Sequence, residues 1–161
     1  MRMRAWFDIY GLDPDSRLDE AGIREGSREI ARLVAREGER GVPPRRIVLA
    51  GFSQGGAIAL HAGLSAPQQP AGIMGLSTFL PLGESIVGDY RQNGSGTPVF
   101  MAHGRLDEVV PCQWGELSAT HLKSIGYKVE WHTYNTGHGI DAGEISDIRS
   151  WLMAVLGDGG E

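Results

Sequence analysis

Apolar and polar residues follow two different periods along this chain. The segment 129–134 alternates apolar and polar residues, 47–50 is apolar throughout, and in 18–37 the apolar residues recur near helical spacing. The first two patterns are typical of strands and the third of an amphipathic helix. We therefore predict strands at about 46–51, 71–77, 97–103 and 127–134, and helices at about 18–37, 54–65, 112–125 and 142–156.

The alternation of strands with helices favours a parallel sheet with right-handed crossover connections. Because the first strand contains the wholly apolar run Ile47–Ala50, we expect it to be buried on both faces. The glycine-rich stretch 83–96 is expected to be a loop, and no repeat or linker divides the sequence. We predict a single α/β domain that spans residues 1–161.

Composition narrows the class of protein. Hydrophobic residues make up 41% and charged residues 22% of the 161 residues, which is ordinary for a soluble globular domain. The formal net charge of −5 offers no basic surface for nucleic acid. The sequence has no apolar run of membrane-spanning length and no apolar signal segment after Met1. The single Cys112 fits a reducing compartment, so we predict a cytoplasmic protein.

The pentapeptide Gly51-Phe52-Ser53-Gln54-Gly55 lies between the first predicted strand and the following helix. A turn this tight places Ser53 at its apex in a strained backbone conformation, where the hydroxyl stands clear of the sheet. The alternative is a phosphate-binding loop, but the GxGxxG spacing and the Lys-Ser/Thr pair of such loops are missing. The pattern favours a nucleophilic serine.

A nucleophilic serine needs a base and an orienting carboxylate. Asp107 lies in the loop after the third predicted strand, and His138 lies between two glycines after the fourth. Both follow strand ends, where open α/β sheets build their sites, and the order Ser, Asp, His is the expected one. We predict catalytic roles for Ser53, Asp107 and His138. The structural alternatives are a helix-capping Asp107 and a His138 that only orders its turn.

Other polar residues receive structural interpretations. His103 is expected to order its glycine turn, with a supporting role behind the catalytic residues as the alternative. The remaining candidates are expected to be surface or packing histidines (His61, His121 and His132), a solvated carboxylate (Glu108), a helix cap (Asp141) and a structural thiol (Cys112).

Four segments together resemble the phospholipase/carboxylesterase family, which includes the acyl-protein thioesterases. They are Ala5–Ile9, Gly-Phe-Ser-Gln-Gly-Gly at 51–56, His-Gly-Arg-Leu-Asp-Glu-Val-Val-Pro at 103–111 and Gly-His-Gly-Ile at 137–140. The resemblance covers essentially the whole chain. It implies an α/β-hydrolase fold, hydrolysis of an ester or thioester, and a triad of Ser53, Asp107 and His138. It implies no metal or organic cofactor.

Members of that family carry further strands and an oxyanion loop ahead of the segment that resembles Ala5–Ile9, and this chain lacks them. We therefore expect a truncated α/β-hydrolase with about four parallel strands flanked by helices. Of the two expected oxyanion donors, only the backbone N–H of Gln54 remains. Loss of one donor costs on the order of 10²–10³ in kcat. Reduced activity is expected, and the alternative is a catalytically inactive remnant that serves as a binding or assembly module.

The resemblance also places the substrate, a small acyl ester, above the strand ends. Candidate acyl-binding side chains are Phe79, Leu80, Trp114 and Trp6, each with ordinary core packing or edge covering as its alternative. In the family fold the first strand has a neighbour that is missing here. Because an apolar strand edge invites pairing, we expect segment 1–15 or a second copy of the chain to cover it. The second case predicts a homo-oligomer.

Overall fold

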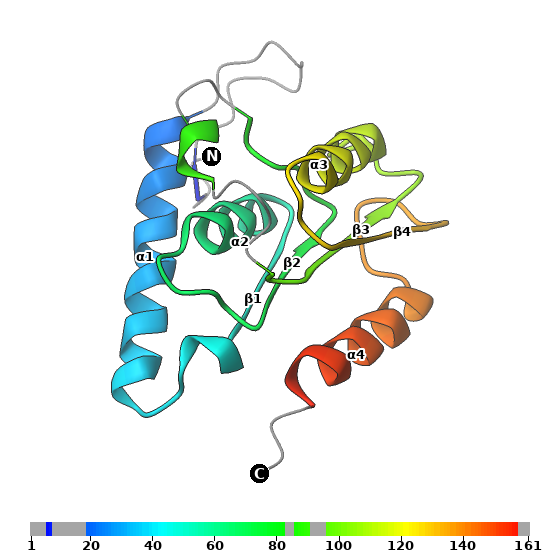
Figure 1. The fold of residues 1–161 in the computed structure, drawn as a ribbon. Coiled ribbons are helices and arrows are strands. Elements are labelled where there is room, and N and C mark those ends of the chain that lie inside the picture. Colours follow the sequence, from blue (N-terminus) through cyan, green and yellow to red (C-terminus); the bar gives the residue numbers. More distant parts are fainter. Residues whose placement is uncertain (1–5, 8–18, 83–85, 91–95, 158–161) are drawn as a thin grey trace, which may run out of the picture.

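The computed structural model describes residues 6–7, 19–82, 86–90 and 96–157. Its sheet has four parallel strands in the order β1 (Val48–Phe52), β2 (Gly72–Leu76), β3 (Val99–Gly104) and β4 (Val129–Tyr134) (Figure 1). The helices are α1 (Glu20–Glu39), α2 (Gln54–Ser65), α3 (Cys112–Ser124) and α4 (Ala142–Leu156), with short 3₁₀ turns η1 (Pro44–Arg46) and η2 (Val87–Asp89). The predicted α/β fold is confirmed, with small shifts at the ends of the elements. The expected burial of the first strand on both faces is wrong, because every residue of β1 is half-buried or exposed beside its open edge.

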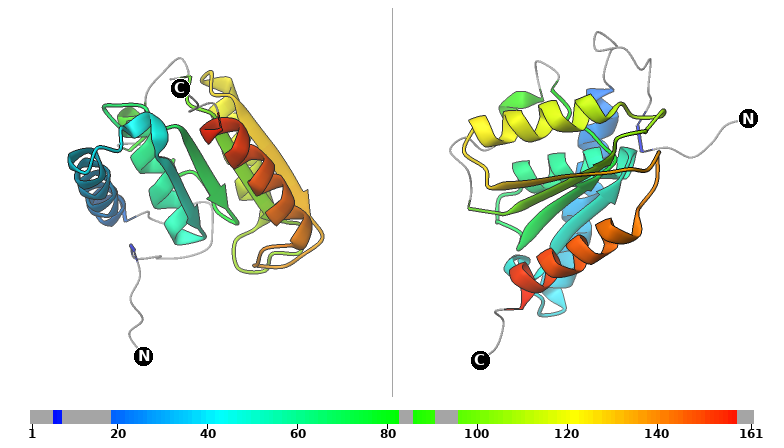
Figure 2. Two further views of the ribbon diagram at one scale, coloured as in Figure 1. Left: turned by 90° about the horizontal axis from the view of Figure 1, so that it is seen from below. Right: turned by 90° about the vertical axis from the view of Figure 1, so that its right-hand side faces the viewer.

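Helices cover both faces of the sheet (Figure 2). Successive residues of a strand point to opposite faces, and each face has its own apolar cluster. On one face, Val99 and Met101 of β3 pack with side chains of α2 and α3. On the other, Phe100 and Ala102 pack with Trp151 of α4. Burial on both faces explains why β2 and β3 contain almost no polar residues.

α1 packs against α2, outside the sheet layer (Figure 1). Asp19 caps its first turn by accepting a hydrogen bond from the Gly22 N–H at 2.9 Å. Ile23 near its start is fully buried against α2, whereas Leu33 in its second half is 54% exposed. The apolar stripe of α1 is therefore only partly used in the core.

β1 lies at one end of the sheet, and its outer edge opens into a groove of about 470 Å³. Leu33 and Val34 of α1 form one side of the groove, and Trp6 contributes to its lining. Phe7 is 4% exposed and packs beside Ile23 between α1 and α2. Most of segment 1–15 lies outside the described residues, so the covering of this edge by that segment or by a second copy stays a prediction.

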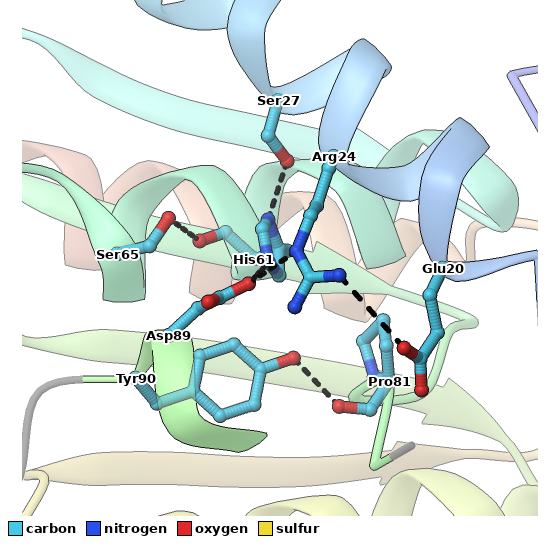
Figure 3. Close-up of polar contacts among 8 residues, drawn as sticks. All are labelled: Glu20, Arg24, Ser27, His61, Ser65, Pro81, Asp89 and Tyr90. Carbon is cyan, nitrogen blue, oxygen red and sulfur yellow. Dashed lines mark hydrogen bonds and ion pairs between the residues drawn. The ribbon is translucent and has the colours of Figure 1, made fainter. Parts of the chain in front are cut away.

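A polar network, buried at Ser27 and His61 and partly exposed at Arg24 and Asp89, joins α1, α2 and η2 (Figure 3). The Ser27 hydroxyl lies 2.6 Å from Nδ1 of His61, and Nε2 of His61 lies 3.2 Å from Oδ2 of Asp89. Arg24 donates to the same Asp89 oxygen at 2.8 Å. Ser27 and His61 are 7% and 3% exposed, so His61 is an interior packing residue.

None of the helices in the described ranges combines the length and the apolar character needed to cross a bilayer. Within the same part of the chain, no three His, Cys, Asp or Glu side chains are grouped so that they could hold a metal ion.

Candidate active site

Ser53 occupies the junction where β1 passes directly into α2, with φ 54° and ψ −124°. Residues other than glycine rarely adopt this backbone conformation, which costs on the order of 1–3 kcal/mol. Its neighbours hold it there, because the Ser53 N–H donates to Leu76 O at 2.9 Å and Thr78 Oγ1 donates to Ser53 O at 2.6 Å. A Cβ at Gly51 would lie 2.1 Å from the Gly55 carbonyl oxygen, so only glycine fits this turn.

His138 follows β4 and reaches back to the serine. Its Nε2 lies 3.1 Å from Ser53 Oγ, and its Nδ1 lies 2.7 Å from Oδ2 of Asp107. The ring packs against Phe52 at a centroid distance of 4.8 Å, and the His138 side chain is 20% exposed. The structure thus brings Ser53, His138 and Asp107 into one hydrogen-bonded chain.

Asp107 is held on both carboxylate oxygens. Oδ1 accepts hydrogen bonds from the backbone N–H groups of Val109 and Val110 at 2.9 and 2.8 Å, and Oδ2 faces His138. Burial opposes ionisation of this fully enclosed side chain, but the hydrogen bonds from His138, Val110 and Val109 outweigh it and hold the pKa of Asp107 below its usual value. An ionised Asp107 can only accept, so Nδ1 of His138 carries the proton and Nε2 is free to accept from Ser53.

The capping alternative for Asp107 does not describe its contacts. The N-cap of α3 is Pro111, and no side chain caps that helix. The carboxylate instead closes a turn within its own loop through Val109 and Val110.

Two loops come together to form this arrangement. The N–H of Leu106, in the loop after β3, donates to the carbonyl oxygen of Thr136, in the loop after β4, at 3.0 Å. A Cβ at Gly104 would lie 2.2 Å from the Gly137 carbonyl oxygen, so the two backbones approach as closely as glycine allows. This contact sets the distance between Asp107 and His138.

Gln54 is the first residue of α2, and the N–H groups at a helix start have no acceptor in a preceding turn. The N–H of Gly56 donates to Ser53 O at 3.0 Å, which leaves those of Gln54 and Gly55 as the candidate anion donors. Its side chain turns toward the N-terminal segment: Nε2 donates to Phe7 O at 3.1 Å, and Oε1 accepts from the Trp6 N–H at 3.4 Å. The N–H groups and the positive end of the helix dipole therefore remain beside Ser53, where they can stabilise an anion.

The predicted acyl-binding side chains lie in different environments. Phe79 and Trp114 contact each other edge to face at a centroid distance of 5.6 Å, and Trp6 is 48% exposed. Leu80 is 2% exposed within the core cluster that contains Val99, so its burial favours the core-packing alternative. For the other three, a role in binding stays a prediction.

Sequence reasoning missed three exposed apolar residues that lie close to Asp107 and His138 in the sequence. Leu106 and Val109 flank Asp107 and are 61% and 49% exposed, and Ile140, two residues after His138, is 47% exposed. Their position next to the motif residues is the signal that could have identified them.

The remaining polar candidates are placed as follows. Asp141 forms a capping box with Glu144 at the start of α4. His132 is half-buried and stacks on Phe100 at a centroid distance of 5.1 Å. Glu108 is exposed and His121 half-buried. Burial, with the nearby charges of Glu116 and Asp107, raises the pKa of the Cys112 thiol, as expected of an unreactive cysteine.

Comparisons with known proteins find related sequences over nearly the whole chain. A family model described as Phospholipase/Carboxylesterase matches residues 1–156. The chain is 41% identical to acyl-protein thioesterase 1 of Gibberella zeae over 97% of this chain and 70% of the relative, and 37% identical to that of Yarrowia lipolytica over 94% and 69%.

Solved structures show the same likeness. The crystal structure of Arabidopsis thaliana SOBER1 superposes with a TM-score of 0.86 at 29% identity, over 96% of this chain and 75% of that one. Esterase PE8 superposes with a TM-score of 0.81 at 27% identity, over 94% and 70%.

Proposed function

The chain belongs to the phospholipase/carboxylesterase family, and from this premise we propose that it hydrolyses short to medium acyl esters or thioesters with Ser53 as the nucleophile. Membership makes it a serine ester hydrolase of the esterase and thioesterase class. The observation that carries the assignment of residues is the hydrogen-bonded chain from Ser53 through His138 to Asp107, beside the N-terminus of α2.

In the first step His138 Nε2 takes the proton from Ser53 as its oxygen attacks the substrate carbonyl carbon. The carbonyl oxygen becomes an oxyanion, which the Gln54 N–H stabilises. Asp107 holds the His138 ring in the required tautomer and stabilises the imidazolium that forms. The distances of 3.1 and 2.7 Å support this proton path.

In the second step the imidazolium of His138 gives its proton to the leaving alcohol or thiol, and the carbon–oxygen or carbon–sulfur bond breaks. An acyl group then remains on Ser53. Water, deprotonated by the same Nε2, attacks this acyl-enzyme and releases the carboxylic acid, so that Ser53 regains its proton.

The class of substrate is supported by two observations. The relatives are named acyl-protein thioesterases, which favours a thioester on an acylated protein. The exposed apolar side chains of Leu106, Val109 and Ile140, in the loops that carry Asp107 and His138, favour an acyl chain over a polar or phosphorylated group.

The test compares three proteins on p-nitrophenyl butyrate and on a butyryl thioester. The wild type is expected to hydrolyse both, and Ser53→Ala is expected to lose at least about 10³-fold in kcat/KM. Ser27→Ala is the matched control, because it removes the same hydroxyl from the buried network of α1 and α2. Its rate is expected to equal that of the wild type.

A fluorophosphonate probe gives a second readout, because it labels only an activated serine. Labelling of the wild type and Ser27→Ala but not of Ser53→Ala is expected. Background hydrolysis and no labelling in both the wild type and Ser53→Ala would overturn the proposal and favour the inactive binding module. Equal catalysed rates would overturn Ser53 as the nucleophile.

A further inference from the structure

His103 lies at the end of β3, directly behind the carboxylate of Asp107. Its side chain is 0% exposed. Its Nε2 lies 2.9 Å from the carbonyl oxygen of Val110 and 3.3 Å from Oδ2 of Asp107. The mechanism above assigns no task to this ring, yet it contacts the same carboxylate oxygen that accepts from His138.

Both groups that face Nε2 of His103 are hydrogen-bond acceptors, so this nitrogen must carry the proton. The other nitrogen, Nδ1, has no hydrogen-bond partner among the described residues and faces the backbone of α3, where a Cβ at Gly115 would lie 2.5 Å away. Burial lowers the pKa of His103, against the opposing effects of the Val110 hydrogen bond and the Asp107 charge. The ring is therefore neutral and donates from Nε2.

Val110 links the His103 ring to the Asp107 carboxylate through its own backbone. Its carbonyl oxygen accepts from His103, while its N–H donates to Oδ1 of Asp107 at 2.8 Å. The His103 ring thus fixes the turn that supplies N–H groups to one oxygen of Asp107, and it lies against the other oxygen. A ring at this place limits the movement of the carboxylate toward or away from His138.

We propose that His103 is a positioning residue for hydrolysis, whose Nε2–H holds the Val110 turn and Oδ2 of Asp107 so that the carboxylate stays aligned with His138. The inference rests on the proposed roles of Ser53, His138 and Asp107. Misplacing a group of this kind by about 1 Å can cost on the order of 10²-fold in rate.

Two substitutions of His103 separate the donated hydrogen bond from simple packing. In His103→Gln the side-chain amide nitrogen can reach the place of Nε2, whereas in His103→Asn the amide is too short. We expect kcat for His103→Asn to fall roughly 10- to 100-fold with little change in KM, and His103→Gln to recover most of that loss. His132→Asn, the same substitution on neighbouring β4, is the control and is expected to leave kcat unchanged.

Rates are expressed per active site, counted by fluorophosphonate titration, so that misfolded protein does not contribute. The acid limb of the kcat/KM profile is expected to move to lower pH in His103→Asn, because a misaligned Asp107 stabilises the His138 imidazolium less well. A change that only reduced the folded fraction would leave that limb where it is.

A measurement on the wild type needs no variant. Nitrogen-15 NMR of the His103 ring is expected to show a neutral imidazole with its proton on Nε2 throughout the active pH range. If His103→Asn does not fold, this spectrum decides.

Equal kcat per site for His103→Asn and His103→Gln would overturn the inference, as would a proton on Nδ1 or a charged ring. These outcomes are distinct from failure of the proposed function, which is shown by an active Ser53→Ala.

Discussion

Two hydrogen-bonded sets of a serine, a histidine and an aspartate occur among the described residues, and their hydrogen bonds are arranged in opposite ways. In Ser53–His138–Asp107 the serine lies at a strand-to-helix turn with a positive φ, and the histidine uses Nε2 toward it. In Ser27–His61–Asp89 the serine lies within helix α1, and the histidine uses Nδ1 toward it (Figure 3).

Both aspartates can ionise, but different groups compensate their charges. The Asp107 side chain is fully enclosed and accepts hydrogen bonds from neutral backbone N–H groups. Because no lysine or arginine of the described residues pairs with it there, its negative charge can stabilise an imidazolium at His138. Asp89 is one-third exposed, and Arg24 holds its pKa below the usual value, followed in effect by His61. The guanidinium thus neutralises the charge that would stabilise an imidazolium at His61.

The comparison indicates that a serine hydrogen-bonded to a histidine, itself bonded to an aspartate, is not enough to make the serine a nucleophile. Ser27 is buried within helix α1, where backbone N–H groups donate to carbonyl groups of the preceding turn. Ser53 directly precedes the first N–H groups of α2, which have no acceptor in a preceding helical turn. The three experiments that follow test this contrast, starting with the largest expected effect.

The aspartates give the largest contrast. Asp107→Asn is expected to lower kcat by about 10⁴-fold, because an amide no longer fixes the tautomer of His138 or stabilises its imidazolium. Asp89→Asn is expected to leave kcat unchanged and to reduce the free energy of unfolding by about 1 kcal/mol or less, since its ion pair with Arg24 is partly exposed. Steady-state kinetics and urea unfolding measure both, and a comparable loss of kcat in Asp89→Asn would contradict the contrast.

The backbone conformation at each serine gives a smaller contrast: the difference in unfolding free energy between the glycine and alanine variants is expected to have opposite signs at Ser53 and Ser27. Ser53→Gly and Ser53→Ala both remove the hydroxyl, but only glycine relieves the positive φ, so the glycine variant is expected to be more stable by about 1 kcal/mol or more. In helix α1, Ser27→Gly is expected to be less stable than Ser27→Ala by about 1 kcal/mol. Urea unfolding of the four variants measures the two differences, and equal signs would refute the assigned strain.

The smallest effect concerns pH. Burial lowers the pKa of His61; Asp89 opposes this shift, and Arg24 adds to it. Unfolded histidine binds a proton near pH 6.5, so the unfolded state binds more protons than the folded one as pH falls below that value. The contribution of neutral His61 to the free energy of unfolding is therefore fully present above about pH 6.5. It is lost as pH falls toward the pKa of folded His61, by at most about 1.4 kcal/mol per pH unit for one proton.

The measurement compares the free energy of unfolding at about pH 7.5 and about pH 5.5 in the wild type and in His61→Gln. The decrease is expected to be smaller in the variant. His103, whose pKa is also lowered, contributes in the same direction in both proteins and does not affect the comparison. An equal decrease in the two proteins would show that His61 does not titrate as described.

Sequence reasoning identified the fold and the residues at the strand ends because both depend on local signals. The strand, the tight turn and the helix around Ser53 are contiguous, and Asp107 and His138 each follow a strand. The buried network was not predictable in this way. Ser27 is 34 positions from His61, and Asp89 lies within the stretch 83–96 that the sequence indicates only as a loop.

Packing explains the other differences. Leu80, Leu106 and Ile140 have similar apolar side chains in loops, yet the first is buried and the others are exposed. Only the tertiary arrangement decides which side a loop side chain faces. Likewise the position of His103 before Gly104 indicates an ordered turn, but not that its ring contacts Asp107.

The positions of Ser53 and His138 have a consequence for folding. They are 85 residues apart, and they follow β1 and β4, which lie at opposite ends of the sheet. Their loops meet only when β2 and β3 lie in register between those two strands. Under the proposed mechanism, turnover therefore reports the assembled fold: a chain that has docked only half of its strands cannot be acylated, however well its serine turn is formed.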